Sequence, residues 1–196
     1  MGWRTFGSDA LPATGTSNPL INSKIQRADH MGIAVNSIVD AIPLYRDVFG
    51  GTLITGGDDY YLGLRTIQYK LSNLKIELLE PLSQESYLAK YLEQHGEGFH
   101  HMTLFVDDVS LTLKDLNSHG FETVDTDLKS PTWRETFVRP KSGFGCLIQV
   151  VDSSLSWSDP HPTMTVNQIL NGEWRWWESQ VWHISMLPDG YPDDYK

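Results

Sequence analysis

An internal repeat constrains the fold of this chain more than any other feature. DHMGIAV (29–35) aligns with HHMTLFV (100–106), and KIELLEP (75–81) aligns with LIQVVDS (147–153). Nearly the same number of residues separates the two segments in each half of the chain. A repeat of this kind predicts two copies of one supersecondary unit that pack together to bury a shared core.

Both halves show the same succession of hydrophobic patterns. Alternating apolar residues predict a strand over 28–35, and an apolar stripe predicts a helix over 38–48 that Pro43 kinks. Further strand patterns in the first half cover about 52–55, 64–71 and 75–79. The second half repeats this order, with a strand, a helix and three strands at about 100–106, 109–118, 122–126, 132–139 and 145–151. A helix at about 84–94, capped by Ser83, connects the halves.

These patterns predict an α+β fold in which paired β-α-β-β-β modules, about 27–82 and 98–152, curl around a shared cleft. Three segments follow from this division. Residues 1–26 form an N-terminal arm without periodicity, residues 27–152 form the two-module domain, and residues 153–196 form an extension with no counterpart in either half.

The C-terminal extension holds five of the seven tryptophans. Left in water, these side chains would form an apolar patch of unusual size. We therefore expect the extension to fold back over the modules or onto the second subunit of a homodimer. Trp174 and Trp177, three residues apart, are placed to share one face of a helix.

Charge and cysteine content exclude several classes of partner. The chain has 25 acidic and 15 basic residues and a formal net charge of −10, so it lacks the cationic surface that nucleic acids and anionic membranes attract. Cys146 is the only cysteine, which excludes an internal disulfide, and we find no signal peptide or membrane-spanning segment. We expect a cytoplasmic protein that acts on a small molecule.

Side chains of the metal-ligating type occupy matched positions in the two halves. His30 and His101 lie at equivalent places in the first strand of each module, and Glu77 and Gln149 at equivalent places in the last strand. Each residue alone has an ordinary structural explanation, but four such residues at matched places in a repeat predict one metal centre. Imidazole nitrogens with carboxylate and amide oxygens suit one divalent ion, namely Co, Mn, Ni, Zn or Fe.

Several sequence runs resemble one known family. They are DHMGIAV, LYRDVFGG, IELLEPL, YLAKYLEQHGEGFHHMTLFVDDV and RPKSGFGCLIQV, within about residues 27–152. Together they resemble the vicinal oxygen chelate (glyoxalase/bleomycin resistance/dioxygenase) superfamily, and in particular its methylmalonyl-CoA epimerase branch. The resemblance implies a paired-module fold around a metal cleft, with metal ligands at His30, Glu77, His101 and Gln149.

The chain departs from this family at two positions. Gln149 stands where the family usually has a glutamate that also transfers protons, and the strand residues where the family carries a second base are Thr66, Ile67 and Gln68. None of these side chains is a base at neutral pH. The departure implies that Glu77 is the one ligating carboxylate able to accept a proton. Other candidates for proton transfer lie in or beside one loop: Asp58, Asp59, Tyr60, Tyr61 and Arg65.

The favoured function is a metal-dependent isomerase, epimerase or lyase. It would remove a proton beside a metal-chelated carbonyl or carboxylate, on a substrate that includes an acyl-CoA among its candidates. Two alternatives stay open at this point. His30, His101 and Glu77 would also satisfy an Fe(II)-dependent oxygenase of the same superfamily, and the same fold serves non-catalytic binding and resistance proteins.

Overall fold

The computed structural model describes residues 23–155 and 158–195, and the predicted arm lies almost entirely outside them. The strands of the described residues are β1 Ile25–Ala34, β2 Thr52–Asp59, β3 Leu64–Leu71, β4 Leu74–Pro81, β5 Gly98–Val106, β6 Thr123–Asp127, β7 Trp133–Val138, β8 Leu147–Ser153, β9 Trp174–Trp177 and β10 Gln180–His183. They form one mixed sheet in the order β10-β9-β2-β3-β4-β1-β5-β8-β7-β6.

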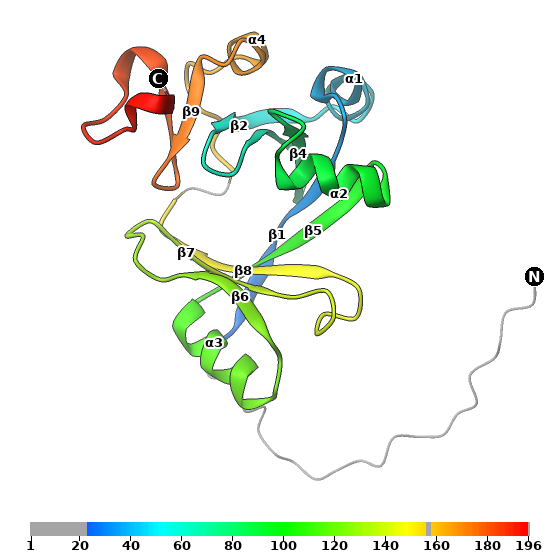
Figure 1. The fold of residues 1–196 in the computed structure, drawn as a ribbon, viewed down its shortest axis with the longest axis vertical. Helices are drawn as coiled ribbons and strands as arrows, with labels where there is room; N and C mark the ends of the chain where they lie inside the picture. The colour runs from blue at the N-terminus through cyan, green and yellow to red at the C-terminus, as the bar shows by residue number, and fades with distance from the viewer. Residues whose placement is uncertain (1–22, 156–157, 196) are drawn as a thin grey trace, which may run out of the picture.

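Strands β1 to β8 of the sheet form two copies of one module that meet between β1 and β5. In the first module β1 pairs in parallel with β4, and in the second β5 pairs in parallel with β8. The antiparallel pair of β1 and β5 joins the modules, and Figure 1 shows these two strands running between the upper and lower halves of the molecule. The predicted α+β fold of paired β-α-β-β-β modules is confirmed.

The first helix changes its winding at Pro43. The α-helix α1 covers Ile38–Ile42, and a π-helical segment, η1, covers Pro43–Val48. The N–H of Phe49 donates to the carbonyl of Leu44 at 3.0 Å, which is the five-residue spacing of a π-helix. Proline has no N–H to continue the α-helical pattern. The predicted kink is therefore a switch from α to π geometry.

The connecting helix begins later than the sequence pattern predicts. The helix α2 covers Tyr87–His95, and its cap is Ser86, whose Oγ accepts from the N–H of Ala89 at 3.1 Å. The predicted cap, Ser83, instead accepts from Glu85 in the preceding turn. In the second module α3 covers Val109–Ser118, as predicted.

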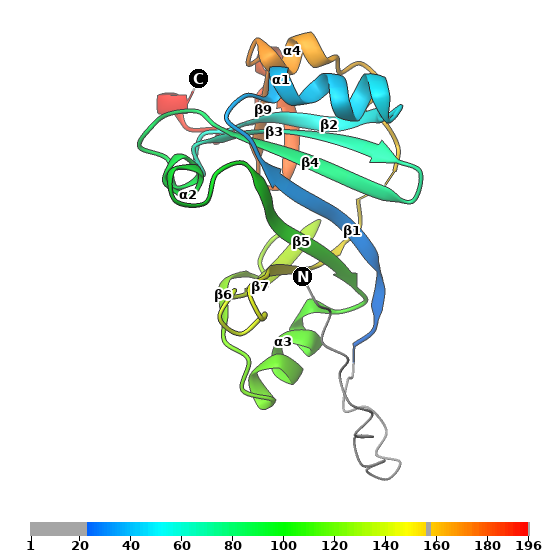
Figure 2. The same ribbon diagram turned by 90° about the vertical axis from the view of Figure 1, so that its right-hand side faces the viewer.

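The chain after Ser153 packs back onto the first module. A short helix, α4, covers Val166–Leu170, and the hairpin of β9 and β10 follows it, ending in the 3-10 turns η2 (Ile184–Met186) and η3 (Asp193–Tyr195). Figure 2 shows α4 beside α1, over the sheet of β2, β3 and β4. Buried Ile169 and Trp174 belong to the same core cluster as residues of α1, β3 and β4.

The prediction that Trp174 and Trp177 share a helical face is wrong. Both lie on β9, where side chains three residues apart point to opposite faces. The spacing of the two tryptophans fits a helix, but β9 pairs with β10 and with β2, the outermost strand of the first module, and this pairing decides its conformation. Trp157 lies outside the described residues. No helix of the described chain is long and apolar enough to cross a membrane.

Candidate metal centre

The β1–β5 pair brings the two histidines together although they lie far apart in the sequence. In the antiparallel register Gly32 faces His101, while His30 faces Thr103. The missing side chain at Gly32 makes this possible, because a Cβ at this position would collide with the His101 ring. The two imidazole rings meet edge to face, with centroids 5.3 Å apart.

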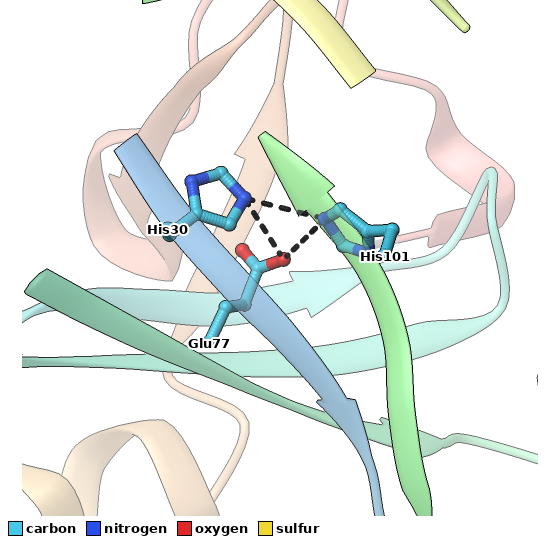
Figure 3. A group of neighbouring side chains, drawn as sticks. All are labelled: His30, Glu77 and His101. Carbon is cyan, nitrogen blue, oxygen red and sulfur yellow. Dashed lines mark hydrogen bonds and ion pairs between the residues drawn. The ribbon is translucent and has the colours of Figure 1, made fainter. Parts of the chain in front are cut away.

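Three of the four predicted ligands converge on one point, as Figure 3 shows. The Nε2 atoms of His30 and His101 lie 3.3 Å apart, and Oε2 of Glu77 lies 3.6 Å from the first and 3.7 Å from the second. The side chains of His30, Glu77 and His101 are buried, with residue exposures of 4, 9 and 6%. Atoms at the corners of such a triangle can all lie about 2.0–2.2 Å from one central ion, the ordinary bond length for these ligand types.

A buried ion pair orients His30. Its Nδ1 donates to Oδ2 of Asp29 at 2.9 Å, and the ammonium of Lys75 lies 3.0 Å from the same oxygen. Burial alone would raise the pKa of Asp29, but the hydrogen bond from His30 and the charge of Lys75 outweigh it and lower that pKa to about 2. The ionised carboxylate holds the ring with Nε2 toward Glu77 and His101, as in carboxylate–histidine–metal arrangements.

His101 is held in the neutral form that a metal ligand requires. Burial, and after it the neighbouring His30 and His100, lower the pKa of His101 well below its usual range. His100 contacts it from the other side, with 2.9 Å between the two Nδ1 atoms. Burial also lowers the pKa of His100.

The fourth predicted ligand, Gln149, reaches the triad through Thr103. The hydroxyl of Thr103 donates to Oε1 of Gln149 at 2.5 Å and lies 2.9 Å from Nε2 of His30. Thr103 is fully buried, at the register position opposite Gln149 on β8. The Thr103 hydroxyl therefore lies between the carboxamide oxygen of Gln149 and the ring of His30.

The sequence analysis missed two residues of this site, Thr103 and Glu135. The amide of Gln149 donates to Oε2 of Glu135 at 2.6 Å, and the indole N–H of Trp133 donates to the same oxygen at 2.8 Å. Burial raises the pKa of Glu135, although these two hydrogen bonds lower it. The repeat contains the signal for Glu135, because β7 is the counterpart in the second module of β3, the strand where the family carries its second base.

The loop candidates for proton transfer have other partners. Both oxygens of Asp58 are bonded to the guanidinium of Arg65, at 2.6 and 3.0 Å, and Arg175 of β9 lies 3.5 Å away. These groups therefore tie the C-terminal extension to β2 and β3. Asp59 accepts from the N–H of Leu62 in the turn after β2, and burial raises its pKa.

The donor set fits a divalent cation. Two imidazole nitrogens and one carboxylate oxygen face each other, and the neighbouring cation, Lys75, is paired with Asp29 instead. Such a set is the one that borderline first-row ions and zinc prefer. The carboxamide oxygen of Gln149 is an acceptor that can ligate an ion, and here it accepts from Thr103 beside the triangle.

The fold and the site together define the class of protein. The chain belongs to the glyoxalase/bleomycin resistance protein/dioxygenase superfamily, because the model of that family matches residues 29–137, more than half of its length. The resemblance inferred from the sequence runs is thus confirmed.

Within this superfamily, several of the similar proteins are epimerases. The mitochondrial methylmalonyl-CoA epimerase of Dictyostelium discoideum is 27% identical over 150 residues, which cover 75% of this chain and 90% of that protein. The ethylmalonyl-CoA/methylmalonyl-CoA epimerase of Cereibacter sphaeroides is 30% identical over 130 residues, covering 64% and 97%. The structure of the methylmalonyl-CoA epimerase from Mycobacterium tuberculosis aligns with a TM-score of 0.61 at 30% identity, over 67% of this chain and 90% of that one.

Proposed function

We propose that this protein is an epimerase that depends on one divalent metal ion and moves the acidic proton beside the carbonyl of an acyl-CoA thioester. The convergence of His30, Glu77 and His101 on one point carries the proposal. The names of the similar proteins support the substrate class, since they are epimerases of methylmalonyl-CoA and ethylmalonyl-CoA.

In this proposal His30, Glu77, His101 and Gln149 hold the ion. A bound divalent ion supplies Lewis-acid stabilisation of the negative charge that develops on a substrate carbonyl oxygen when the neighbouring proton leaves. Asp29 and Lys75 keep the His30 ring in its ligating orientation. Glu77 accepts the proton, while the amide of Gln68, 2.8 Å from Oε1, holds its carboxylate in place.

Elemental analysis and proton exchange test the proposal together. We expect purified protein to contain about one equivalent of a divalent ion and to exchange the C2 proton of methylmalonyl-CoA in D₂O, followed by NMR. His30→Ala and His101→Ala should each lose the metal and the exchange together, because each removes one of two nitrogen ligands. His95→Ala is the matched control, since it removes an exposed imidazole that is not part of the ligand triangle.

Two outcomes would contradict the proposal. Metal-free protein in every preparation, with no exchange on addition of Co²⁺ or Mn²⁺, would indicate a binding module of the same fold. The two-histidine, one-carboxylate set also suits an Fe(II) oxygenase. Oxygen consumption with Fe(II), measured with an oxygen electrode, together with an absence of proton exchange, would favour that class.

A further inference from the structure

Each module contains a hydrogen-bonded pair of one glutamine and one glutamate. The two residue types exchange strands between the modules. In the first module Gln68 on β3 donates to Glu77 on β4, with 2.8 Å between Nε2 and Oε1. In the second module Gln149 on β8 donates to Glu135 on β7, with 2.6 Å between Nε2 and Oε2. The carboxylate is therefore on the last strand of one module and on the preceding strand of the other.

The strand registers show which positions are equivalent. On the last strands, Glu77 lies opposite Gln68, and Gln149 lies opposite Phe137. Two residues further along, Leu79 lies opposite Thr66. In the second module, Val151 lies opposite Glu135 in the same way. Glu135 thus occupies the place in the second module that Thr66 occupies in the first.

Glu135 is connected to the site through Gln149 and Thr103. Gln149 donates to Glu135, the Thr103 hydroxyl donates to Gln149, and the oxygen of that hydroxyl lies 2.9 Å from Nε2 of His30. Both hydrogen bonds to Glu135 end on Oε2, and no described residue donates to Oε1.

The two carboxylates come from different modules, on either side of the strands that carry the two histidines. In the sheet order, β4 and β7 lie on either side of the central strands β1 and β5. Epimerisation at one carbon needs proton transfer on both faces of a planar intermediate, so it needs two groups placed in this way.

We propose that Glu135 is the second acid–base group of the site and serves the substrate face opposite to Glu77. This inference rests on the proposed function. In the arrangement that the family resemblance implies, the ligating carboxylate lies in the second module and the other base lies in the first. In this chain the two are exchanged: the ligating carboxylate is Glu77 of the first module, and the other is Glu135 of the second.

The proton balance of the reaction needs no further reactant. One carboxylate accepts the C2 proton as the C–H bond breaks, and the electron pair passes to the carbonyl oxygen as an enolate. The other carboxyl group, in its protonated form, then gives its proton to C2 from the opposite face, and the electron pair returns to form the new C–H bond. Each turnover leaves one carboxyl group protonated and one ionised, with their roles reversed.

The test follows each face separately. The two C2 epimers of methylmalonyl-CoA are incubated one at a time in D₂O with metal-loaded wild type or Glu135→Gln, and NMR records exchange at C2 while chiral analysis records interconversion. We expect Glu135→Gln to slow interconversion by about 10²–10⁴-fold, the usual contribution of one proton-transfer group. Exchange should persist with one epimer only, the one whose proton faces Glu77.

Metal content and melting temperature show whether the Glu135→Gln variant folds and binds metal like the wild type. Both should match wild type, because the carboxamide oxygen that Glu135→Gln introduces still accepts from Gln149, and Glu135 does not contact the ligand triangle. Glu122→Gln is the control, since it removes an exposed carboxylate of the same module. It should behave as wild type.

Wild-type interconversion in Glu135→Gln would overturn the inference and leave the proposed function intact. Equal loss of exchange with both epimers, at normal metal content, would also overturn it, because a group acting on one face cannot produce that result. A wild-type protein that exchanges neither epimer would overturn the proposed function itself. Failure of this inference is therefore seen in the Glu135→Gln variant, whereas failure of the proposed function is seen in the wild-type protein.

Discussion

At the scale of single residues, the candidate ligands depend on neighbours that do not themselves belong to the triangle. Asp29 fixes the orientation of His30, and Gly32 leaves room for the His101 ring. Both neighbours belong to β1, one directly before His30 and one two residues after it. The short segment DHMG therefore contains a ligand, the group that orients it and the space for the second imidazole.

Replacing Asp29 should weaken the metal site without removing a ligand. Asp29→Asn exchanges a carboxylate acceptor for an amide and loses the charge beside His30 and Lys75. Changes of this kind behind a ligand usually cost about 10–100-fold in metal affinity. Isothermal titration calorimetry of the metal-free protein with Co²⁺ measures this affinity. Asp47→Asn, at an exposed carboxylate paired with Arg46, is the control, and equal affinity in both variants would contradict the role given to Asp29.

At the scale of elements, the C-terminal extension completes the core of the first module. Helix α4 contributes Ile169 and strand β9 contributes Trp174, and both pack with Ile67 and Leu78 of the sheet. The pairing of β9 with β2 also covers an edge strand, and the buried Asp58 is shared between Arg65 and Arg175 at this junction. The second module has no such cover among the described residues, and its β6 remains the edge of the sheet.

We expect truncation of Ile169 to destabilise the whole domain. Ile169→Ala removes a fully buried side chain and should lower the free energy of unfolding by about 2–5 kcal/mol. Ile184→Ala, in the same extension but 45% exposed, should change it by less than about 0.5 kcal/mol. Urea denaturation followed by tryptophan fluorescence compares the two. An effect of Ile169→Ala as small as that of Ile184→Ala would mean that the extension does not belong to the cooperative core.

At the scale of the whole molecule, the candidate metal centre joins the two modules. His30 and Glu77 come from the first module and His101 from the second. A ligand that binds only the folded state stabilises it by mass action. An ion held by residues of both modules should therefore stabilise the domain as a unit.

Metal addition should raise the melting temperature of the protein. At free Co²⁺ about 100 times its dissociation constant, the stabilisation is about 2.7 kcal/mol, or roughly 5–10 °C for a chain of this size. EDTA should reverse the shift. His101→Ala should show none, and a shift of equal size in that variant would place the stabilising ion elsewhere.

The sequence by itself determined the architecture and indicated the three residues that the structure brings together in the candidate metal centre. Strand periodicity and the matched spacing of the two halves are local properties of the chain, so they predicted both modules and the equivalence of His30 with His101. Once the strand registers are set, the alternation of side chains along each strand places these residues on the same face of the sheet as Glu77. For the same reason the predictions of the helix over 109–118 and the strand over 64–71 were accurate.

Only the tertiary structure decided which side chains complete the site. Thr103 and Glu135 belong to it because strands β5, β8 and β7 lie side by side, and their hydrogen bonds join residues far apart in the chain. Asp58 appeared available in the sequence, but Arg175, 117 positions away, neutralises it together with Arg65. The conformation of β9 likewise depends on its pairing with β2 and β10, which local spacing does not encode.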